Sequence, residues 1–490
     1  METLQRTANR GSISTGPYQI NNSLKLEADN TEYLYKANDS GTNRKTFTVS
    51  MWFKRTELSN DYMQLWQGGD SGGATRLGFY GGTPKEAIWV DLSSGGTYKR
   101  SYSTQVLRDT SAFYHIVLAV DTTQSTEANR FRLWLNGEEV TSWSQRQYPA
   151  LNFDVSLLGG GVMKWGAYDS TYYKMCGYIA ECHYLDGVAK VQTDFGEYDE
   201  DSGIWIPKVY TGTYGGNGCY LKFNNSSALG TDSSGNGNTF TLNNISASDQ
   251  ATDTCTNNFC ILMPPQHSIT GTATVVSEGG TQMKGGSTSQ QNAFGSIGVR
   301  SGKWYFESNV SNLGGVASYS FMFGVIAADR ITALNNGGGY YIGEIANTWG
   351  FTSNNRGSTG GTENPNFPSE TATSGTTEVM GIALDMDNGK IWVHKAGTYA
   401  TNNSGVTGNP ATGAAPQYDN LLTATDEHIL VGGGVYASTN AQRNMNFGNP
   451  MSANFTGVGT NSDANGYGSF AYAPPSGYYA LCTKNLAEYG

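Results

Sequence analysis

Residues 115–140 read HIVLAVDTTQSTEANRFRLWLNGEEV, and residues 379–397 read VMGIALDMDNGKIWVHKAG. In both stretches an apolar alternation leads into a turn, and a second alternation containing a tryptophan follows. A period of two with β-branched and aromatic residues is typical of β-strands, and Asn388-Gly389 supplies the positive φ angles of a tight turn. We therefore predict two β-hairpins, whose likeness indicates two domains of related architecture.

The composition agrees with a chain of many short strands. Its 490 residues suffice for two or three domains with their own cores. Glycine is frequent, with 64 residues, whereas charged residues make up only 14%. No sustained helical stripe is present. The predicted fold class is all-β, with two antiparallel, jelly-roll-like β-sandwich domains in tandem after a short extended N-terminal arm.

Changes in composition along the chain suggest the domain boundaries. Residues 1–20 are polar and without periodicity, which predicts the arm. Strand-like segments then follow one another over 21–245. The alternation fades over 246–270, where Pro264-Pro265 indicates a linker, and a second strand series covers 271–490. Long Gly/Ser/Thr/Asn stretches interrupt this second series and predict surface loops.

Charge and hydropathy exclude several classes of protein. The formal net charge of −11 and the lack of a basic block argue against nucleic-acid binding. No apolar run reaches the roughly 18 residues that span a bilayer, so membrane insertion is not expected. The first residues contain no signal-like apolar segment, which predicts a protein that is not conventionally secreted. The six cysteines lack any CxxC pair, so we expect free thiols and no zinc site.

Several chemistries lack support in the sequence. A retaining glycosidase needs two carboxylates about 5–5.5 Å apart, and the nearest match, Glu197-Tyr198-Asp199-Glu200-Asp201, lies in a Gly-flanked acidic segment. The five histidines are isolated, and no phosphate-binding loop is present. We expect no catalytic residues, no cofactor and no assigned metal site. Calcium stays an alternative, with Asp199, Asp201 and Asp232 as candidate ligands.

The strand motifs carry a family resemblance. SLKLEADNTEYL, TFTVSMWFKR, the first hairpin and GYIAECHYLDGVA resemble a concanavalin A-like, laminin-G-like sandwich. SGKWYFES, the FGV and WGF strands and the second hairpin resemble a SPRY domain. The combination is similar to bacteriophage virion proteins, often from marine phages, that are described as tail-fibre or other structural proteins.

That resemblance implies a role, although a fold of this kind hosts many functions. It implies a non-enzymatic virion protein, made in the host bacterial cytoplasm, that acts as a tail fibre and recognises a host-surface glycan or receptor. A homo-oligomer, such as a trimer, follows by resemblance only. A capsid decoration or head-fibre protein is the first alternative. A concanavalin-like glycan hydrolase is the second.

Two groups of residues are candidates for contact with partners. Tyr340, Tyr341 and Trp349 lie beside a glycine run and a long polar loop, where an aromatic ring can stack on a sugar; alternate core positions are the other interpretation. Arg6, Arg10 and Tyr18 in the arm are candidates for anchoring to other virion proteins, against the alternative of a disordered tail.

Overall fold

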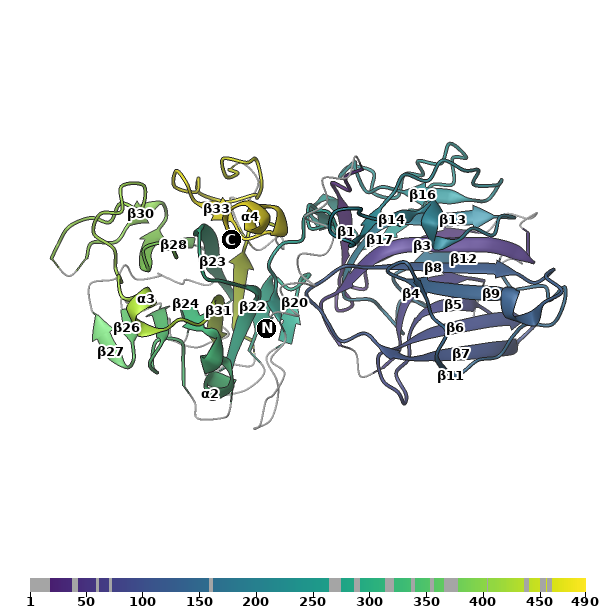
Figure 1. The fold of residues 1–490 in the computed structure, drawn as a ribbon, viewed down its shortest axis with the longest axis horizontal. Coiled ribbons are helices and arrows are strands. Elements are labelled where there is room, and N and C mark those ends of the chain that lie inside the picture. The colour runs from purple at the N-terminus through teal and green to yellow at the C-terminus, as the bar shows by residue number, and fades with distance from the viewer. Residues whose placement is uncertain are drawn as a thin grey trace. The chain divides into compact units, whose positions relative to one another are not determined.

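The computed structural model shows two compact units (Figure 1), here called the first unit, residues 18–257, and the second unit, residues 258–490. Both are built from antiparallel sheets packed as sandwiches, so the predicted all-β class is confirmed. The described residues are 18–37, 43–58, 61–69, 73–157, 162–263, 275–285, 291–312, 321–335, 340–352, 357–364, 378–402, 404–435, 440–449, 455 and 461–490. Among these residues, no helix is long and apolar enough to cross a membrane.

The first unit contains two eight-stranded sheets. Sheet 1 has the strand order β10-β9-β8-β3-β13-β1-β18, and β16 pairs with β13. Its strands are β1 (Ser23–Leu26), β3 (Thr46–Arg55), β8 (Tyr114–Asp121), β9 (Phe131–Leu135), β10 (Glu138–Glu139), β13 (Gly177–Asp186), β16 (Cys219–Leu221) and β18 (Gln250–Ala251). A separate two-stranded ribbon joins β14 (Gly196–Tyr198) to β15 (Trp205–Pro207).

Sheet 2 has the order β11-β7-β6-β5-β4-β12-β2-β17. Its strands are β2 (Tyr33–Ala37), β4 (Met63–Gly68), β5 (Thr75–Phe79), β6 (Ala87–Ser94), β7 (Thr97–Val106), β11 (Trp143–Gln145), β12 (Val162–Trp165) and β17 (Thr241–Asn243). The core lies between the two sheets, because every second residue of the central strands enters one apolar cluster. Val49 and Leu118 contribute from sheet 1, and Leu77 and Val90 contribute from sheet 2.

The second unit repeats this arrangement with two further sheets. One has the order β19-β22-β31-β24-β25-β26-β27, and the other has the order β20-β21-β32-β23-β28-β29-β30. The strands of the first are β19 (Leu262–Met263), β22 (Gln291–Val299), β24 (Phe321–Ala327), β25 (Thr348–Thr352), β26 (Gly357–Thr359), β27 (Thr362–Asn364) and β31 (Ile429–Val435). Those of the second are β20 (Val275–Ser277), β21 (Gln282–Lys284), β23 (Lys303–Asn312), β28 (Met380–Asp385), β29 (Lys390–Lys395), β30 (Thr398–Tyr399) and β32 (Gln442–Asn446).

Short elements complete the second unit. The strand β33 (Tyr479–Ala480) runs parallel to β23. The helices α2 (Ile331–Asn335), α3 (Leu421–Ala424) and α4 (Thr483–Tyr489) have at most seven residues. The core again lies between the sheets, with Phe323 and Val431 from one and Phe306 and Ile382 from the other.

Both predicted hairpins are present. In the first unit β8 pairs with β9, and in the second β28 pairs with β29. Gly389 closes the second hairpin at a φ of 66°. In the first unit the Asn136-Gly137 pair has φ angles of 48° and 86°, and it turns β9 into β10. Glycine and asparagine adopt such angles at little cost, which explains their position at these turns.

Each hairpin also buries a histidine. His115 on β8 is 1% exposed; its Nδ1 accepts a hydrogen bond from the Trp205 indole N–H, and its Nε2 lies 3.0 Å from Ser50 Oγ. His394 on β29 accepts the Gly397 backbone N–H at Nδ1, and its Nε2 lies 2.7 Å from the Tyr305 hydroxyl. Burial lowers the pKa of both rings to about 3. Both histidines are therefore neutral packing residues.

The predicted linker, residues 246–270, is shared between the units where it is described. β18 pairs with β1, which places residues up to Asn257 in the first unit, and β19 pairs with β22 in the second. These strands have two residues each, too few to give a visible alternation. The residues around Pro264 lie outside the described part of the chain.

The six cysteines are all buried and form no disulfide, as predicted. Burial is the largest cause that raises the pKa of the Cys182 and Cys219 thiols. A protonated, enclosed thiol is unreactive, so these side chains act as small apolar packing groups.

Candidate functional site

The outward side of sheet 2 is unusually rich in tyrosine. On β6, Trp89 and Asp91 alternate with Ile88, Val90 and Leu92, which enter the core, so the first two side chains face away from it. Tyrosines lie on the same side of β2 and β7, next to the ends of β4 and β5, and on the segment 166–175 that follows β12. We call this surface the tyrosine face; its tyrosines are Tyr33, Tyr35, Tyr62, Tyr80, Tyr98, Tyr102, Tyr168, Tyr172 and Tyr173.

The rings of the tyrosine face contact one another and remain partly open to solvent. Tyr80 stacks on Tyr102 with ring centroids 4.0 Å apart, and Tyr62 meets Trp89 edge-on at 4.7 Å. Tyr62 also lies 4.9 Å from Tyr173. Eight of the nine tyrosines are half-buried and Tyr172 is 56% exposed, whereas Trp89 is only 3% exposed. The face therefore offers tyrosine rings and hydroxyl groups that are held in place by mutual packing.

A charged row crosses the face beneath these rings. The strand register places Arg76 opposite Asp91, and Asp91 opposite Arg100. Arg76 Nη1 and Arg100 Nε each lie 3.6 Å from an oxygen of Asp91. The Arg76 guanidinium lies 4.6 Å from the ring centre of Tyr168, and that of Arg100 lies 4.9 Å from the ring centre of Tyr98. The side chain of Arg100 is half exposed, whereas Asp91 is fully covered.

Several buried polar atoms in and beside this row have no hydrogen-bond partner within the protein. Both carboxylate oxygens of Asp91 are among them, together with Gln64 Oε1, Arg76 Nε and Ser93 Oγ. A buried polar atom without a partner costs roughly 1–3 kcal/mol. Atoms of this kind occur elsewhere in both units, for example Tyr184 Oη and Arg443 Nε, but here several of them lie on adjacent strands below the tyrosine rings.

The electrostatics of the row also depend on this burial. Burial raises the pKa of Asp91, and the Trp89 indole and the Arg100 and Arg76 guanidinium groups offset part of that rise without reaching hydrogen-bond geometry. Burial, with the nearby Asp91 carboxylate, also raises the pKa of Tyr102 to about 12. The tyrosine hydroxyl is therefore a neutral donor and acceptor at physiological pH.

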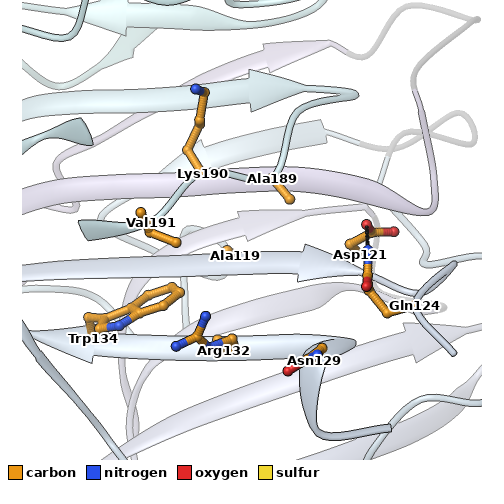
Figure 2. A pocket seen from close by; sticks show the side chains of 9 residues that line it. All are labelled: Ala119, Asp121, Gln124, Asn129, Arg132, Trp134, Ala189, Lys190 and Val191. Carbon is orange, nitrogen blue, oxygen red and sulfur yellow. Dashed lines mark hydrogen bonds between the residues drawn. The ribbon is translucent and has the colours of Figure 1, made fainter. Parts of the chain in front are cut away.

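A second candidate is a hollow of about 300 Å³ on the outward side of sheet 1 (Figure 2). It is lined by Ala119, Asp121, Gln124, Asn129, Arg132, Trp134, Ala189, Lys190 and Val191. Arg132 pairs with Glu139 and covers Trp134, and Lys190 pairs with Asp194. Trp134, the single aromatic residue of this lining, is 2% exposed and offers no ring face, so the hollow is less suited to a sugar than the partly exposed rings of the tyrosine face.

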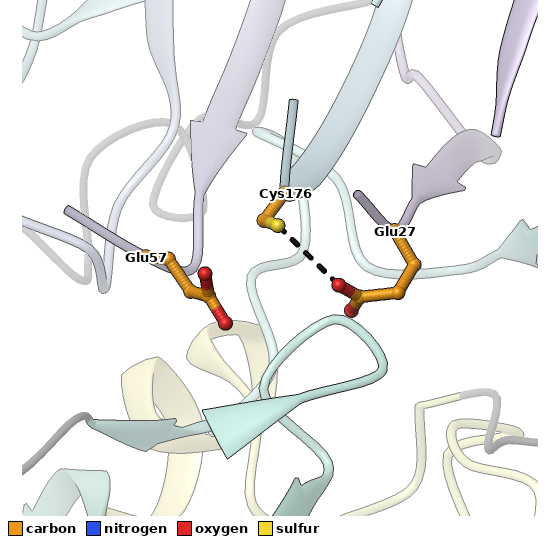
Figure 3. A group of neighbouring side chains, drawn as sticks. All are labelled: Glu27, Glu57 and Cys176. Atoms are coloured by element: carbon orange, nitrogen blue, oxygen red, sulfur yellow. Dashed lines mark hydrogen bonds between the residues drawn. The ribbon is translucent and has the colours of Figure 1, made fainter. Parts of the chain in front are cut away.

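A third group brings together possible metal ligands (Figure 3). Glu27 directly follows β1, Glu57 follows β3, and Cys176 precedes β13, which lies between those two strands. One ligand atom from each lies within 4.8 Å of the others, and Cys176 Sγ donates to Glu27 Oε1 at 3.3 Å. Burial and the Glu27 charge raise the pKa of Glu57 to about 7. These residue types can bind a divalent cation.

The aromatic residues proposed from the sequence do not form one site. Trp349 is fully buried in the core of the second unit, where its indole N–H donates to Asn420 Oδ1 at 3.1 Å. It offers no ring face to a ligand, so the alternate core position weighed from the sequence is the one observed. Tyr340 is 42% exposed, and Tyr341 is half-buried, with its backbone N–H donating to Glu344.

Of the three candidate anchoring residues in the arm, the structure describes Tyr18. Arg6 and Arg10 lie outside the described residues. The Tyr18 hydroxyl donates to Glu181 Oε2 at 2.7 Å and lies 2.9 Å from the Tyr220 hydroxyl, so Tyr18 packs on its own unit. Glu181 has a φ of 48° and is 7% exposed. In this structure Tyr18 secures the entry into β1, where Ile20 is already buried.

The three aspartates named for calcium serve turns instead. Asp199 accepts the Ser202 backbone and hydroxyl protons. Asp232 accepts from the backbone of Tyr220 and Asn238 and from Ser234. Asp201 is exposed in the turn between β14 and β15. The structure does not bring the three carboxylates together in one group.

Sequence comparison identifies part of the first unit. Residues 28–187 match the family model described as the Concanavalin A-like lectin/glucanases superfamily. The first unit contains a concanavalin A-like domain. No curated protein matches the chain.

Three solved structures are similar to parts of the chain at low identity and low TM-score. A candidate carbohydrate binding protein from Bacteroides ovatus has 16% identity and a TM-score of 0.33, over 46% of this chain and 59% of that protein. The SPRY domain of human HERC1 has 15% identity and a TM-score of 0.26, over 35% of this chain and 91% of that domain. Domains LG4-5 of the mouse laminin alpha1 chain have 8% identity and a TM-score of 0.30, over 89% of this chain and 90% of that one.

The tyrosine face was not found from the sequence, although a signal was present. On β7, Tyr98, Arg100 and Tyr102 recur with a period of two, and on β6 Trp89 and Asp91 do the same. On β6 the alternate positions are apolar, so this pattern predicts an aromatic, charged surface on the side of the sheet away from the core.

Proposed function

We propose that the first unit is a carbohydrate-binding module whose ligand lies on the tyrosine face. The observation that carries this proposal is the layer of partly exposed tyrosine rings over a polar row in which the half-exposed Arg100 makes no hydrogen bond to Asp91. Sugars present hydroxyl donors and flat apolar patches, and the combination of aromatic rings with polar acceptors complements both. The match of residues 28–187 to a superfamily of lectins and glucanases supports the same class of ligand.

We further propose that this module binds without hydrolysis. Asp91 is the sole acidic residue within the eight described strands of sheet 2. Glycoside hydrolysis requires two carboxyl groups about 5–9.5 Å apart on opposite sides of the bond that breaks. The acidic segment 197–201 begins in the β14–β15 ribbon, apart from sheet 2. There Glu197 forms an ion pair with Lys208, which directly follows β15, and Oε2 lies 3.2 Å from Nζ.

The setting proposed for this binding is a bacteriophage virion, where the chain would act as a tail-fibre protein that recognises a host-surface glycan. This part of the proposal rests on the sequence resemblance to virion proteins, and so does a homo-oligomeric state. Cryo-electron microscopy of purified particles tests it. We expect density for this chain at the tail. Density over the capsid would instead favour a decoration protein, and absence from particles would contradict the virion role.

Binding itself is tested with a tyrosine variant. Tyr102→Ala removes a half-exposed ring stacked on Tyr80. Losing one stacking ring costs about 1.4 kcal/mol, a tenfold weaker affinity. The matched control is Tyr198→Ala, which removes a tyrosine that is 45% exposed on β14, away from sheet 2. Affinity electrophoresis through gels containing polysaccharides measures the binding. Equal retardation of the wild type and the Tyr102→Ala variant would contradict the proposed site.

A further inference from the structure

The charged row of the tyrosine face carries more positive than negative charge. Arg76 and Arg100 flank Asp91, so two guanidinium groups share one carboxylate and the row has a net charge of +1. This local sign is opposite to that of the chain, whose net charge is −11. A local excess of positive charge in an acidic protein attracts anions to that place.

The two arginines also have unused hydrogen-bonding capacity. Each contacts Asp91 only at 3.6 Å, beyond hydrogen-bond distance, and Arg76 Nε is buried without a partner. A guanidinium carries five N–H donors and binds carboxylate or sulfate groups through two of them at once. The rings of Tyr98 and Tyr168 fix the planes of the two groups. Arg100, whose side chain is 48% exposed, is the one that a ligand reaches first.

We propose that the tyrosine face selects an anionic glycan, a polysaccharide bearing carboxylate or sulfate ester groups, whose anion binds Arg100 and Arg76 while its sugar rings lie on the tyrosines. This inference rests on the proposed function and specifies its class of ligand. A carboxylated sugar and a sulfated sugar share the chemistry that a guanidinium recognises, and the probes below separate them.

Matched polysaccharides test the inference. Polygalacturonate is compared with its methyl-esterified form, and dextran sulfate with dextran, by affinity electrophoresis and calorimetry of the full chain. At least one anionic probe is expected to bind tenfold or more tightly than its neutral counterpart, and its affinity should fall as salt is added. Equal binding of the charged and neutral forms would overturn the inference and leave the proposed function standing. Failure of all four probes to bind would overturn both.

Two substitutions should change the affinity for the anionic probe in opposite directions. Arg100→Gln lowers the net charge of the row from +1 to 0 and should weaken binding of the anionic probe at least tenfold. Asp91→Asn keeps the shape of the side chain, raises the net charge to +2 and should strengthen that binding. Weaker binding of the anionic probe by the Asp91→Asn variant would overturn the inference, because it would show that Asp91 accepts hydroxyl protons of the sugar instead of lowering the positive charge of the row. Arg108→Gln, at an exposed position beyond β7, is the control and should leave affinity unchanged. Circular dichroism verifies that each variant is folded.

Discussion

Acid should destabilise the first unit through His115. The ring is held neutral because it is buried, with the Trp52 ring covering it at 4.7 Å, and because Nδ1 accepts the Trp205 indole proton. An indole N–H can only donate, so a proton on Nδ1 would place two donors against each other. Burial accordingly lowers the pKa of His115 from 6.5 to about 3.

The sign and size of the effect follow from linkage. Below pH 6.5 the unfolded chain takes up a proton that the folded unit refuses, so stability is lost as the pH falls from 6.5 towards 3. Between pH 7 and pH 5 the free energy of unfolding should drop by about 2 kcal/mol from this group alone, since each pH unit below 6.5 contributes about 1.4 kcal/mol. Urea unfolding of the full chain at the two pH values measures the drop.

Comparison of the wild type with the His115→Gln variant isolates the contribution of the His115 ring to the pH dependence. The variant has no ring to protonate, so its own drop between pH 7 and pH 5 should be smaller than that of the wild type by about 2 kcal/mol. Groups that titrate in both proteins cancel in the difference. His394→Gln serves as the equivalent test in the second unit, where burial lowers the pKa in the same way. An identical pH dependence in the wild type and the His115→Gln variant would refute the reasoning.

Two further predictions concern packing. Asp253→Ala should lower the free energy of unfolding by about 3–5 kcal/mol in denaturant titrations, because Lys54 Nζ lies 2.6 Å from Asp253 Oδ2 with both side chains fully buried; a loss below 1 kcal/mol would show that Lys54 finds water or another anion. Gly218→Ala should cost about 1–3 kcal/mol, since a Cβ there would lie 1.9 Å from the Tyr214 carbonyl oxygen, whereas Gly216→Ala meets open space and should change the melting temperature little. Equal melting temperatures for these two glycine variants would contradict the backbone contact.

The fold was predictable because its signal is local. Both hairpins are written as alternations within about 20 residues, and the structure pairs Val117 with Trp134 and Ala383 with Trp392 as such alternations require. The tyrosine face depends instead on register between strands. Arg76, Asp91 and Arg100 come together because β5, β6 and β7 pair in one particular register, and a shift by one residue would send them into the core.

The group of Glu27, Glu57 and Cys176 was also not predictable, because its members are far apart in the sequence. Its members come together only because β13 pairs with both β1 and β3, which places Gly177 beside Leu26 and Arg55. Nothing in the spacing of these three residues along the chain indicates that contact. Trp349 was misplaced for the same reason. A tryptophan next to glycines suggests an exposed ring, and only the packing of the two sheets shows that it is buried.

The buried cysteines make this protein convenient for site-specific labelling. All six native thiols are enclosed, so a maleimide dye should leave them unmodified in the folded chain. A single cysteine introduced at the exposed position Thr97, next to Tyr98, would then be the one reactive thiol. A fluorophore attached there would report directly on the occupancy of the neighbouring surface, without any native residue having to be replaced first.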